Sequence, residues 1–371
     1  MHMKKNVISK GEKMKTLIKP KALKTGDTIA SISLSFGAAG LFPKRYEQGV
    51  KQIEESFGVK VIPTPHALCT PEEVYEHPEW RLSDFMWAFE NPEIKGILSN
   101  IGGDDTIRML PLMTEKHFET IYNNPKIFMG LSDTTVNHMM CFKAGLTSFY
   151  SPSLLFGYAE NGGIPEIMVE NTKKTLFSTA PVGVLPESKE FIVENVDWGL
   201  ESAPIRERIP STPWRYIQGD SVVCGPLIGG CTDVLMSTII GTKLWPELDD
   251  FNNAILFLED SEEQPPADWV LYWMRNLGAQ GILERLAGLL FARPGNARFK
   301  NKEEKQKWLA KYPDFDKAIL KGLKEFGRTD LPVVTNMDYG HTLPQLILPY
   351  GVMAEINPKK KTVSLLENAV V

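Results

Sequence analysis

Short apolar runs alternate with helical patterns along the first part of the chain. Tyr46, Val50, Ile53 and Phe57 recur at spacings of four, three and four residues, which marks one face of a helix. This alternation is typical of parallel strands joined by crossover helices. It predicts strands over residues 28–33, 60–62, 96–98 and 126–129, and helices over residues 82–89 and 134–144.

The second part of the chain continues with apolar runs at residues 254–258, 288–291 and 331–334, separated by helical stretches. Three later segments, 345–348, 352–356 and 362–366, predict a small antiparallel meander whose last turn forms around Asn357-Pro358. We therefore predict an α/β protein, with a Rossmann-like, mostly parallel N-terminal sheet and a C-terminal α/β domain that carries the meander.

Prolines and Gly162-Gly163 interrupt every long periodic element between residues 151 and 220, as linkers and irregular loops do. We place the domain junction there, because 371 residues exceed the usual size of one domain. The predicted divisions are a tail (1–20), an N-terminal domain with the nucleophile (21–165), a linker with substrate loops (166–220) and a C-terminal domain with the catalytic Glu and His (221–371).

Composition and charge limit the classes of partner that the protein is expected to bind. The net charge is −5, and the one basic cluster, residues 359–361, is interpreted as a solvated hairpin tip, so no nucleic-acid partner is expected. No apolar run resembles a signal peptide or is long enough to cross a bilayer, so we expect a cytoplasmic protein without a membrane partner. The four cysteines lack CxxC spacing and are interpreted as reduced thiols.

Reacting side chains of an open parallel sheet collect at the carboxyl ends of its strands. Ser132 follows the apolar run 127–129 at a predicted sharp turn into a helix, where the backbone N–H of Asp133 is placed to hold an oxyanion. The sequence Gly-Leu-Ser-Asp-Thr is only half of a G-x-S-x-G elbow. A serine that merely caps the helix would give the same pattern.

Glu259 directly follows the run 254–258, and a carboxylate at the end of so apolar a strand must be paired or must reach the crevice. It is a candidate to orient a histidine, or else a partnered structural acid. Asp260, Glu262 and Glu263 are neighbouring acids that compete for this role, and one or more of them is expected in a solvated loop or helix start.

His341 lies in a glycine-containing loop beyond the run 331–334 and is the best candidate for a base. His138 lies six residues after Ser132, so on a helix it faces another direction. A serine nucleophile needs a base, and the base works best when an acid fixes its tautomer. Ser132, His341 and Glu259 supply these three roles.

A second glycine feature, residues 100–105, allows backbone amides to approach a ligand closely, although a turn with an aspartate cap fits equally well. It is neither a P-loop nor a GxGxxG motif, so no nucleotide cofactor is expected. No HExxH motif or clustered set of acids and histidines indicates a metal.

Several separated segments together resemble the LD-carboxypeptidases, serine peptidases that include murein tetrapeptide carboxypeptidases and microcin C immunity peptidases. The segments are residues 23–30, Ser99 to Asp105, Gly130 to Asp133, Gly229-Gly230, Leu256 to Asp260, and Asn336 to Thr342. The resemblance implies a nucleophile at Ser132, an acid at Glu259, a base at His341 and oxyanion donors in the backbone amides of Gly103 and Asp133. It also implies hydrolysis through an acyl-enzyme without metal or cofactor, in a two-domain homodimer.

The length of the chain, its SNIGGDD loop and its longer 260–269 segment are more similar to the immunity branch, whose members cut the amide between an aspartyl group and a modified adenylate. Candidate substrate-binding residues are Gly102, Asp104 and Trp198, the last as a stacking partner for a nucleobase or else a core or interface residue. The expected partner is a small peptide or an aminoacyl nucleotide. The alternatives are a murein carboxypeptidase that releases D-alanine and a noncatalytic ligand-binding protein.

Overall fold

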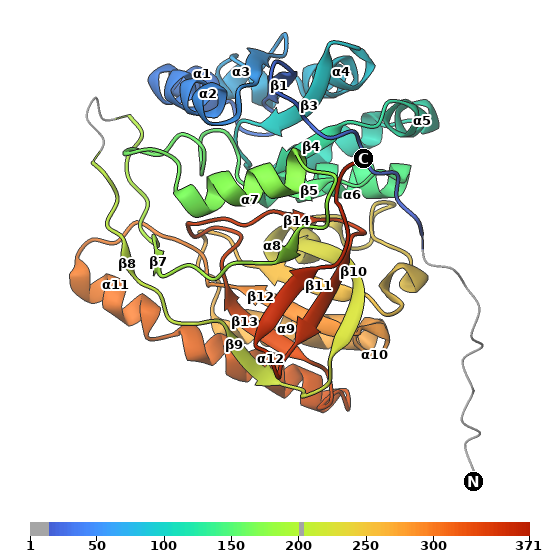
Figure 1. Cartoon of the computed structure of the whole chain (residues 1–371), viewed down its shortest axis with the longest axis vertical. Helices are drawn as coiled ribbons and strands as arrows, with labels where there is room; N and C mark the ends of the chain where they lie inside the picture. Colours follow the sequence, from blue (N-terminus) through green and yellow to red (C-terminus); the bar gives the residue numbers. More distant parts are fainter. Residues whose placement is uncertain (1–14, 200–203) are drawn as a thin grey trace.

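The computed structural model describes residues 15–199 and 204–371. Within these residues the first part of the chain builds one sheet and the second part another, in the upper and lower halves of the molecule (Figure 1). The first sheet has the spatial order β14 (Leu348–Pro349), β5 (Phe149–Tyr150), β4 (Ile127–Gly130), β3 (Ile94–Ser99), β1 (Thr28–Ile32) and β2 (Lys60–Pro63).

All neighbours in this first sheet are parallel except β14, which runs antiparallel to β5. The order β2-β1-β3-β4-β5 is that of a doubly wound sheet, with its topological switch point between β1 and β3. The helices of this part are α1 (Ala38–Leu41), α2 (Pro43–Phe57), α3 (Pro71–Glu76), α4 (Pro78–Glu90), α5 (Glu115–Asn123), α6 (Thr135–Ala144) and α7 (Glu166–Leu176), with 3-10 turns η1 (Thr106–Leu112) and η2 (Ser132–Thr134).

The second sheet has a parallel centre and antiparallel flanks. Its order is β6 (Gly183–Val184), β16 (Thr362–Leu365), β15 (Met353–Asn357), β10 (Val223–Cys231), β11 (Ile255–Glu259), β12 (Gly288–Ala292), β13 (Val333–Met337) and β9 (Arg215–Gln218). A separate pair joins β7 (Glu190–Phe191) and β8 (Ile209–Pro210). The helical elements here are α8 (Thr232–Val234), η3 (Leu235–Ile239), η4 (Leu248–Phe251), α9 (Ala267–Ala279), α10 (Ile282–Arg285), α11 (Lys302–Leu309) and α12 (Tyr312–Glu325).

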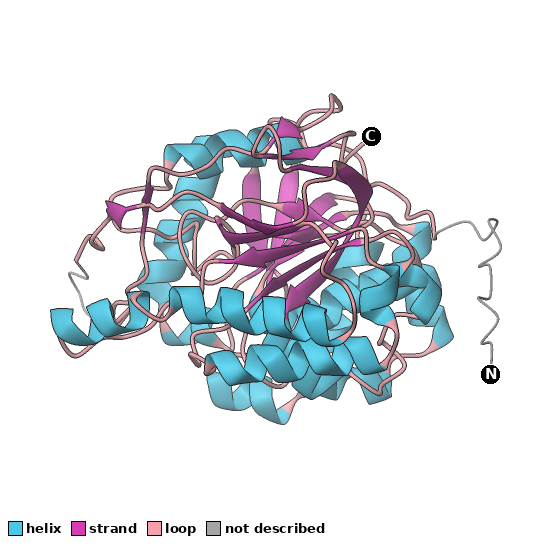
Figure 2. Ribbon diagram, turned by 90° about the horizontal axis from the view of Figure 1, so that it is seen from below, coloured by secondary structure: helices cyan, strands magenta, loops and turns pink. Residues whose placement is uncertain are grey.

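The central strands are apolar because both faces of the sheets are covered. Every residue of β11 and β12 is buried, as expected for parallel strands with helices on their faces. Figure 2 shows the strands running through the middle of the molecule with helices packed around them. The predicted fold class is therefore confirmed, including the antiparallel meander, which consists of β10, β15 and β16. Among the described residues, no helix is both long and apolar enough to cross a membrane.

The segment predicted as the first strand of the meander is the exception. Residues 345–348 do not join the second sheet; instead Leu348 and Pro349 form β14, which pairs with β5 in the first sheet. Leu346, Ile347 and Leu348 are all buried, so the run lacks the alternation of a strand with one solvated face. Its return to the first sheet fastens the two halves of the chain together.

The predicted tail and linker contribute to the folded core. Residues 1–14 of the predicted tail lie outside the described residues, but Leu17 is buried and Ile18 forms a bridge with Leu146. Within the predicted linker, α7 contacts α2, and β9 is an edge strand of the second sheet. The prolines of residues 151–220 therefore mark irregular packing rather than an exposed connection.

Arg293 and Asp338 form a buried ion pair of 2.9 Å, and Asp338 also accepts a hydrogen bond from Trp214 Nε1 at 2.8 Å. Because Arg293→Ala leaves this carboxylate buried without its cation, we expect the free energy of unfolding to fall by about 3 kcal/mol or more. Urea unfolding, followed by tryptophan fluorescence, measures this change in the free energy of unfolding. The exposed pair Arg275–Glu325 is the control, and Arg275→Ala should cost at most about 1 kcal/mol. Equal losses would contradict the argument.

Candidate active site

The carboxyl ends of both parallel sheets face one cavity of about 230 Å³. Loops after β1, β3 and β4 supply one side, at the switch point of the first sheet, and loops after β11, β12 and β13 supply the other. The lining residues are Phe36, Ile101, Gly102, Gly103, Leu131, Ser132, Phe156, Asn195, Trp198, Glu262, Asn296 and His341.

Ser132 stands at the tight connection between β4 and α6. Its φ angle is 62°, a left-handed conformation that costs a non-glycine residue energy and is common at functional sites. Its backbone N–H donates a hydrogen bond of 3.1 Å to the Tyr150 hydroxyl. The N-cap of α6 is Thr134, so Ser132 does not cap that helix. The predicted strand-to-helix turn is present, and the serine lines the cavity.

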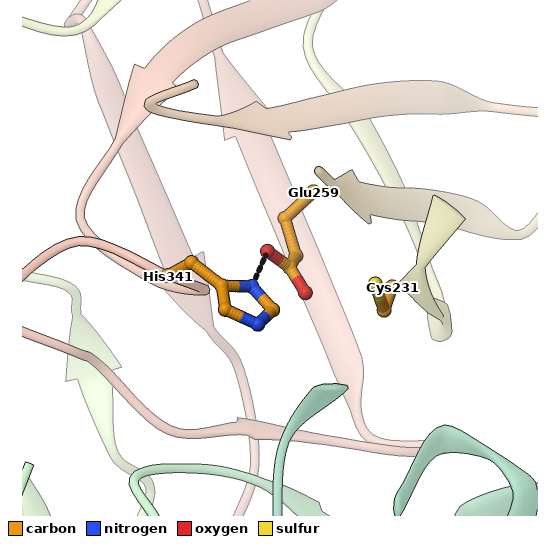
Figure 3. Close-up of side chains that lie close together, drawn as sticks. All are labelled: Cys231, Glu259 and His341. Carbon is orange, nitrogen blue, oxygen red and sulfur yellow. Dashed lines mark hydrogen bonds and ion pairs between the residues drawn. The ribbon is translucent and has the colours of Figure 1, made fainter. Parts of the chain in front are cut away.

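Glu259 and His341 form a direct pair. Glu259 ends β11 and is completely buried, and its Oε2 atom lies 2.6 Å from His341 Nδ1 (Figure 3). The Tyr150 hydroxyl donates a short hydrogen bond to the other carboxylate oxygen, Oε1. Gly340 permits this approach: its φ is 80°, and a Cβ there would lie 2.6 Å from Glu259 Oε2. The buried carboxylate is thus paired and also oriented toward a histidine in the cavity.

The second ring nitrogen of His341 faces another acid. His341 Nε2 lies 3.2 Å from Glu262 Oε2. Burial alone would lower the pKa of His341, but the charges and hydrogen bonds of Glu259 and Glu262 outweigh it and raise this pKa well above its usual value. Partial burial opposes ionisation of Glu262, yet its contact with His341 lowers its pKa to about 2. The structure therefore favours an imidazolium held between two carboxylates.

The other acids after β11 take different places. Asp260 is fully buried and accepts a hydrogen bond of 3.2 Å from the Gly295 N–H, and its burial and the charge of Glu259 raise its pKa well above the usual value. Glu263 is exposed and lies in the loop before α9. Of the three neighbouring acids, Glu262 alone lines the cavity.

The glycine loop after β3 lies against the serine turn. A side chain at Gly102 would come within 3.1 Å of Ser132 Oγ and 3.2 Å of the Asp133 backbone nitrogen. Gly103 has a φ of 148°, and a Cβ there would lie 2.1 Å from Ser35 Oγ. Asp133 itself is buried, where its carboxylate accepts a hydrogen bond from the Thr106 N–H. The glycine loop therefore packs directly against the serine turn, with Gly102 beside the Asp133 backbone nitrogen and both glycines in the cavity lining.

Asp104 faces a different space. It lines a neighbouring acidic cavity together with Asp105, Glu72 and Glu76, and does not line the cavity that contains Ser132.

Trp198 is half-buried in the wall of the cavity, and two neighbouring side chains contact its ring. The Arg45 guanidinium lies 4.5 Å from the centre of the indole ring, and the Phe42 ring meets the indole edge to face at 5.8 Å. Arg45 is itself buried and ion-paired with Glu160 at 3.2 Å. Trp198 is therefore a fixed aromatic surface rather than an interior residue.

His138 is excluded as the base by its surroundings. It is fully buried on α6, where its ring nitrogens contact Ser148 Oγ at 2.9 Å and the Gly130 carbonyl at 3.0 Å. Burial lowers its pKa to about 3, so it stays neutral and structural.

Cys231, Glu259 and His341 are close enough to be tested as a metal site, because one ligand atom from each lies within 4.8 Å of the others. Their contacts suit hydrogen bonding better. Figure 3 marks an interaction only between His341 and Glu259. Burial and the charge of Glu259 raise the pKa of the Cys231 thiol well above its usual value. Both carboxylate oxygens of Glu259 already accept hydrogen bonds, from His341 Nδ1 and the Tyr150 hydroxyl.

Sequence reasoning missed Tyr150, Asn195 and Asn296. Tyr150 ends a strand of only two residues, too short for a periodic signal, although its place after α6 marks it as a strand end. Asn195 and Asn296 exchange two side-chain hydrogen bonds of 3.0 and 2.8 Å across the cavity wall. Both lie in irregular loops, where no pattern predicts a partner.

Comparison with known proteins matches both halves of the chain to domains of one family. The model of the LD-carboxypeptidase N-terminal domain matches residues 29–151, and that of the C-terminal domain matches residues 224–356. The chain is 28% identical to the microcin C7 self-immunity protein MccF of Escherichia coli (93% of this chain, 94% of that protein) and 26% identical to the probable murein peptide carboxypeptidase of Bacillus subtilis (93% of each).

A solved structure gives the same result. An MccF-like protein from Streptococcus pneumoniae in complex with AMP superposes with a TM-score of 0.77, at 29% identity over 91% of this chain and 98% of that one. Since the two family models together cover most of the chain and occur in the expected order, this protein belongs to the LD-carboxypeptidase family.

Proposed function

We propose that this protein is a serine-type hydrolase that cleaves small aminoacyl-nucleotide amides through an acyl-enzyme, as a microcin C immunity-like enzyme. Membership of the family supports a carboxypeptidase-type hydrolase in general. The observation that carries the catalytic assignment is the 2.6 Å contact between Glu259 and His341 in the cavity that also contains Ser132. This arrangement supports the roles of nucleophile, base and orienting acid for these three residues, which come from distant segments of the chain.

In the first half of the reaction, Ser132 Oγ attacks the carbonyl carbon of the amide and His341 Nε2 accepts its proton. The oxyanion that forms accepts hydrogen bonds from the Gly103 and Asp133 N–H groups, a role supported by the packing of the glycine loop against the serine turn. Glu259 stabilises the imidazolium. The carbon–nitrogen bond then breaks, His341 returns the proton to the leaving nitrogen, and the acyl group remains as an ester on Ser132.

In the second half, His341 removes a proton from a water molecule that attacks this ester. The same backbone donors hold the second oxyanion, and His341 returns the proton to Ser132 Oγ. The products are a free carboxylic acid and the amine. In the resting structure His341 Nε2 is paired with Glu262, so this contact must open before Ser132 can transfer its proton.

The aminoacyl-nucleotide class is favoured by the wall of the cavity. Trp198 offers an aromatic surface on which a nucleobase can stack, and its ring is held by the contact with the Arg45 guanidinium. The AMP complex of the related protein from Streptococcus pneumoniae and the similarity to MccF support the same class. The second candidate is release of D-alanine from a murein tetrapeptide, which the similarity to the Bacillus subtilis protein favours.

Ser132→Ala should reduce kcat on every substrate by about 10³-fold or more, because the acyl-enzyme can no longer form. His341→Ala should do the same, and the double variant should be no worse than either single one, since the residues act as a unit. Mass spectrometry of product release from an aspartyl sulfamoyl adenosine and a murein tetrapeptide measures this. A noncatalytic binding protein would instead bind ligand without product, and equal turnover by wild type and Ser132→Ala would reject the catalytic assignment.

The pH dependence of kcat/KM should follow from the charged groups around His341. The groups that face it are Glu259, Glu262 and, more distantly, Asp260. Activity needs the neutral imidazole, so kcat/KM should fall as the pH drops through a pKa above the usual value of about 6.5. Glu259→Gln removes one negative charge and should move this acidic limb to lower pH while reducing kcat. An unmoved limb would contradict the role given to Glu259.

Trp198→Ala separates the two substrate classes. Loss of base stacking should raise KM for an aminoacyl sulfamoyl adenosine by about tenfold, since one stacked base contributes about 1–3 kcal/mol. The murein tetrapeptide has no nucleobase, so its KM should change little. Trp198→Phe, which keeps an aromatic face, is the matched control and should retain most of the affinity. Equal KM changes for both substrates would argue against nucleobase stacking.

A further inference from the structure

Glu262 is an unusual residue for this cavity. Among the residues that the structure describes, it is the one carboxylate in the lining, and neither lysine nor arginine lines the cavity with it. Its side chain is 52% exposed, so solvent and a ligand can reach it, unlike Glu259, which is completely buried. In the proposed reaction, Glu262 takes part only through its contact with His341 Nε2, which must open.

Glu262 lies close to the atoms that are proposed to react. Its Oε2 atom is 3.2 Å from His341 Nε2, the nitrogen that must accept the proton of Ser132. In a reactive complex the substrate carbonyl carbon lies about 3–3.5 Å from the attacking oxygen. In an aminoacyl group the α-nitrogen is two bonds from this carbon, or about 2.5 Å away. Because Ser132, His341 and Glu262 line the same small cavity, a free α-ammonium group can lie within reach of the Glu262 carboxylate.

We propose that Glu262 binds the free α-ammonium group of the acyl residue, and that this group draws the carboxylate away from His341 Nε2. The proposal rests on the proposed function and deepens it. It restricts the preferred substrates to aminoacyl amides with an unblocked amine, and it disfavours acyl residues whose α-nitrogen is part of a peptide bond, as in a murein tetrapeptide.

The charges of the site explain the exchange. In the resting protein, the His341 ring lies between the carboxylates of Glu259 and Glu262, and these two negative charges favour its imidazolium form. An ammonium group donates charge-assisted hydrogen bonds to Glu262 in place of the imidazolium. His341 then loses one of its two stabilising anions, so it releases its Nε2 proton to solvent and becomes the acceptor for Ser132. A substrate with an acylated, uncharged nitrogen leaves Glu262 on His341.

Two matched substrates test this, alanyl sulfamoyl adenosine and its N-acetylated form, at pH 7, where most α-amines are protonated. The readout is the ratio of kcat/KM for the free amine to kcat/KM for the acetylated compound. Wild type should prefer the free amine, and Glu262→Gln should reduce the ratio by about tenfold or more, the amount expected for a charged hydrogen bond. Because Glu262 also contacts His341, turnover of both compounds can change, but a ratio cancels any shared effect.

Glu263→Gln is the control. Glu263 is the next residue, and its side chain is exposed and does not line the cavity, so this change removes the same charge outside the site. Its ratio should equal that of wild type. An unchanged ratio in Glu262→Gln overturns the proposal, while continued turnover that depends on Ser132 leaves the proposed function intact. If wild type cleaves neither compound, calorimetry measures their affinities for Ser132→Ala. This variant should bind the free-amine compound at least tenfold more tightly than the acetylated compound. Equal affinities for the two compounds overturn the proposal.

Discussion

The site depends on one buried carboxylate. Glu259 is completely inaccessible to solvent and accepts hydrogen bonds from two donors, His341 Nδ1 and the Tyr150 hydroxyl. A buried charge without partners would be costly, so these donors are needed for the fold as well as for the chemistry. Because Tyr150 also accepts the hydrogen bond from the Ser132 N–H, a single chain of contacts links the three proposed catalytic residues.

This chain of contacts also joins the two halves of the molecule. Tyr150 belongs to the first sheet, whereas Glu259 belongs to the second. Two further features hold the halves in register: β14 returns to pair with β5, and Tyr350, which follows β14, donates a hydrogen bond of 2.8 Å to the Gly229 carbonyl. The carboxyl ends of two separate sheets therefore meet at one cavity, which neither sheet could form alone.

The main features of this arrangement could be predicted from local pattern. The apolar runs before Ser132 and Glu259 are strands, and a residue that follows a parallel strand lies at its carboxyl end. Other features depend on contacts between distant segments. Nothing in residues 345–348 indicates which sheet they join, and the choice of Glu262 over Glu263 as the cavity acid depends on how the 260–266 loop turns. Tyr150 was missed because its role depends on its contact with Glu259, which is 109 residues away in sequence.

The two carboxylates of His341 differ in what the fold allows them to do. Glu259 is the last residue of a central strand and is fixed by burial and by Tyr150, so it keeps one imidazole orientation throughout the reaction. Glu262 lies three residues later, in a loop with its side chain half in solvent, and no second contact of comparable kind holds it among the described residues. Under the proposed mechanism, a fixed acid on Nδ1 and an adjustable acid on Nε2 would allow the same histidine to be charged at rest and neutral when a substrate cation binds the second acid. The strand end supplies the rigid part of the site, and the loop supplies the part that responds to substrate.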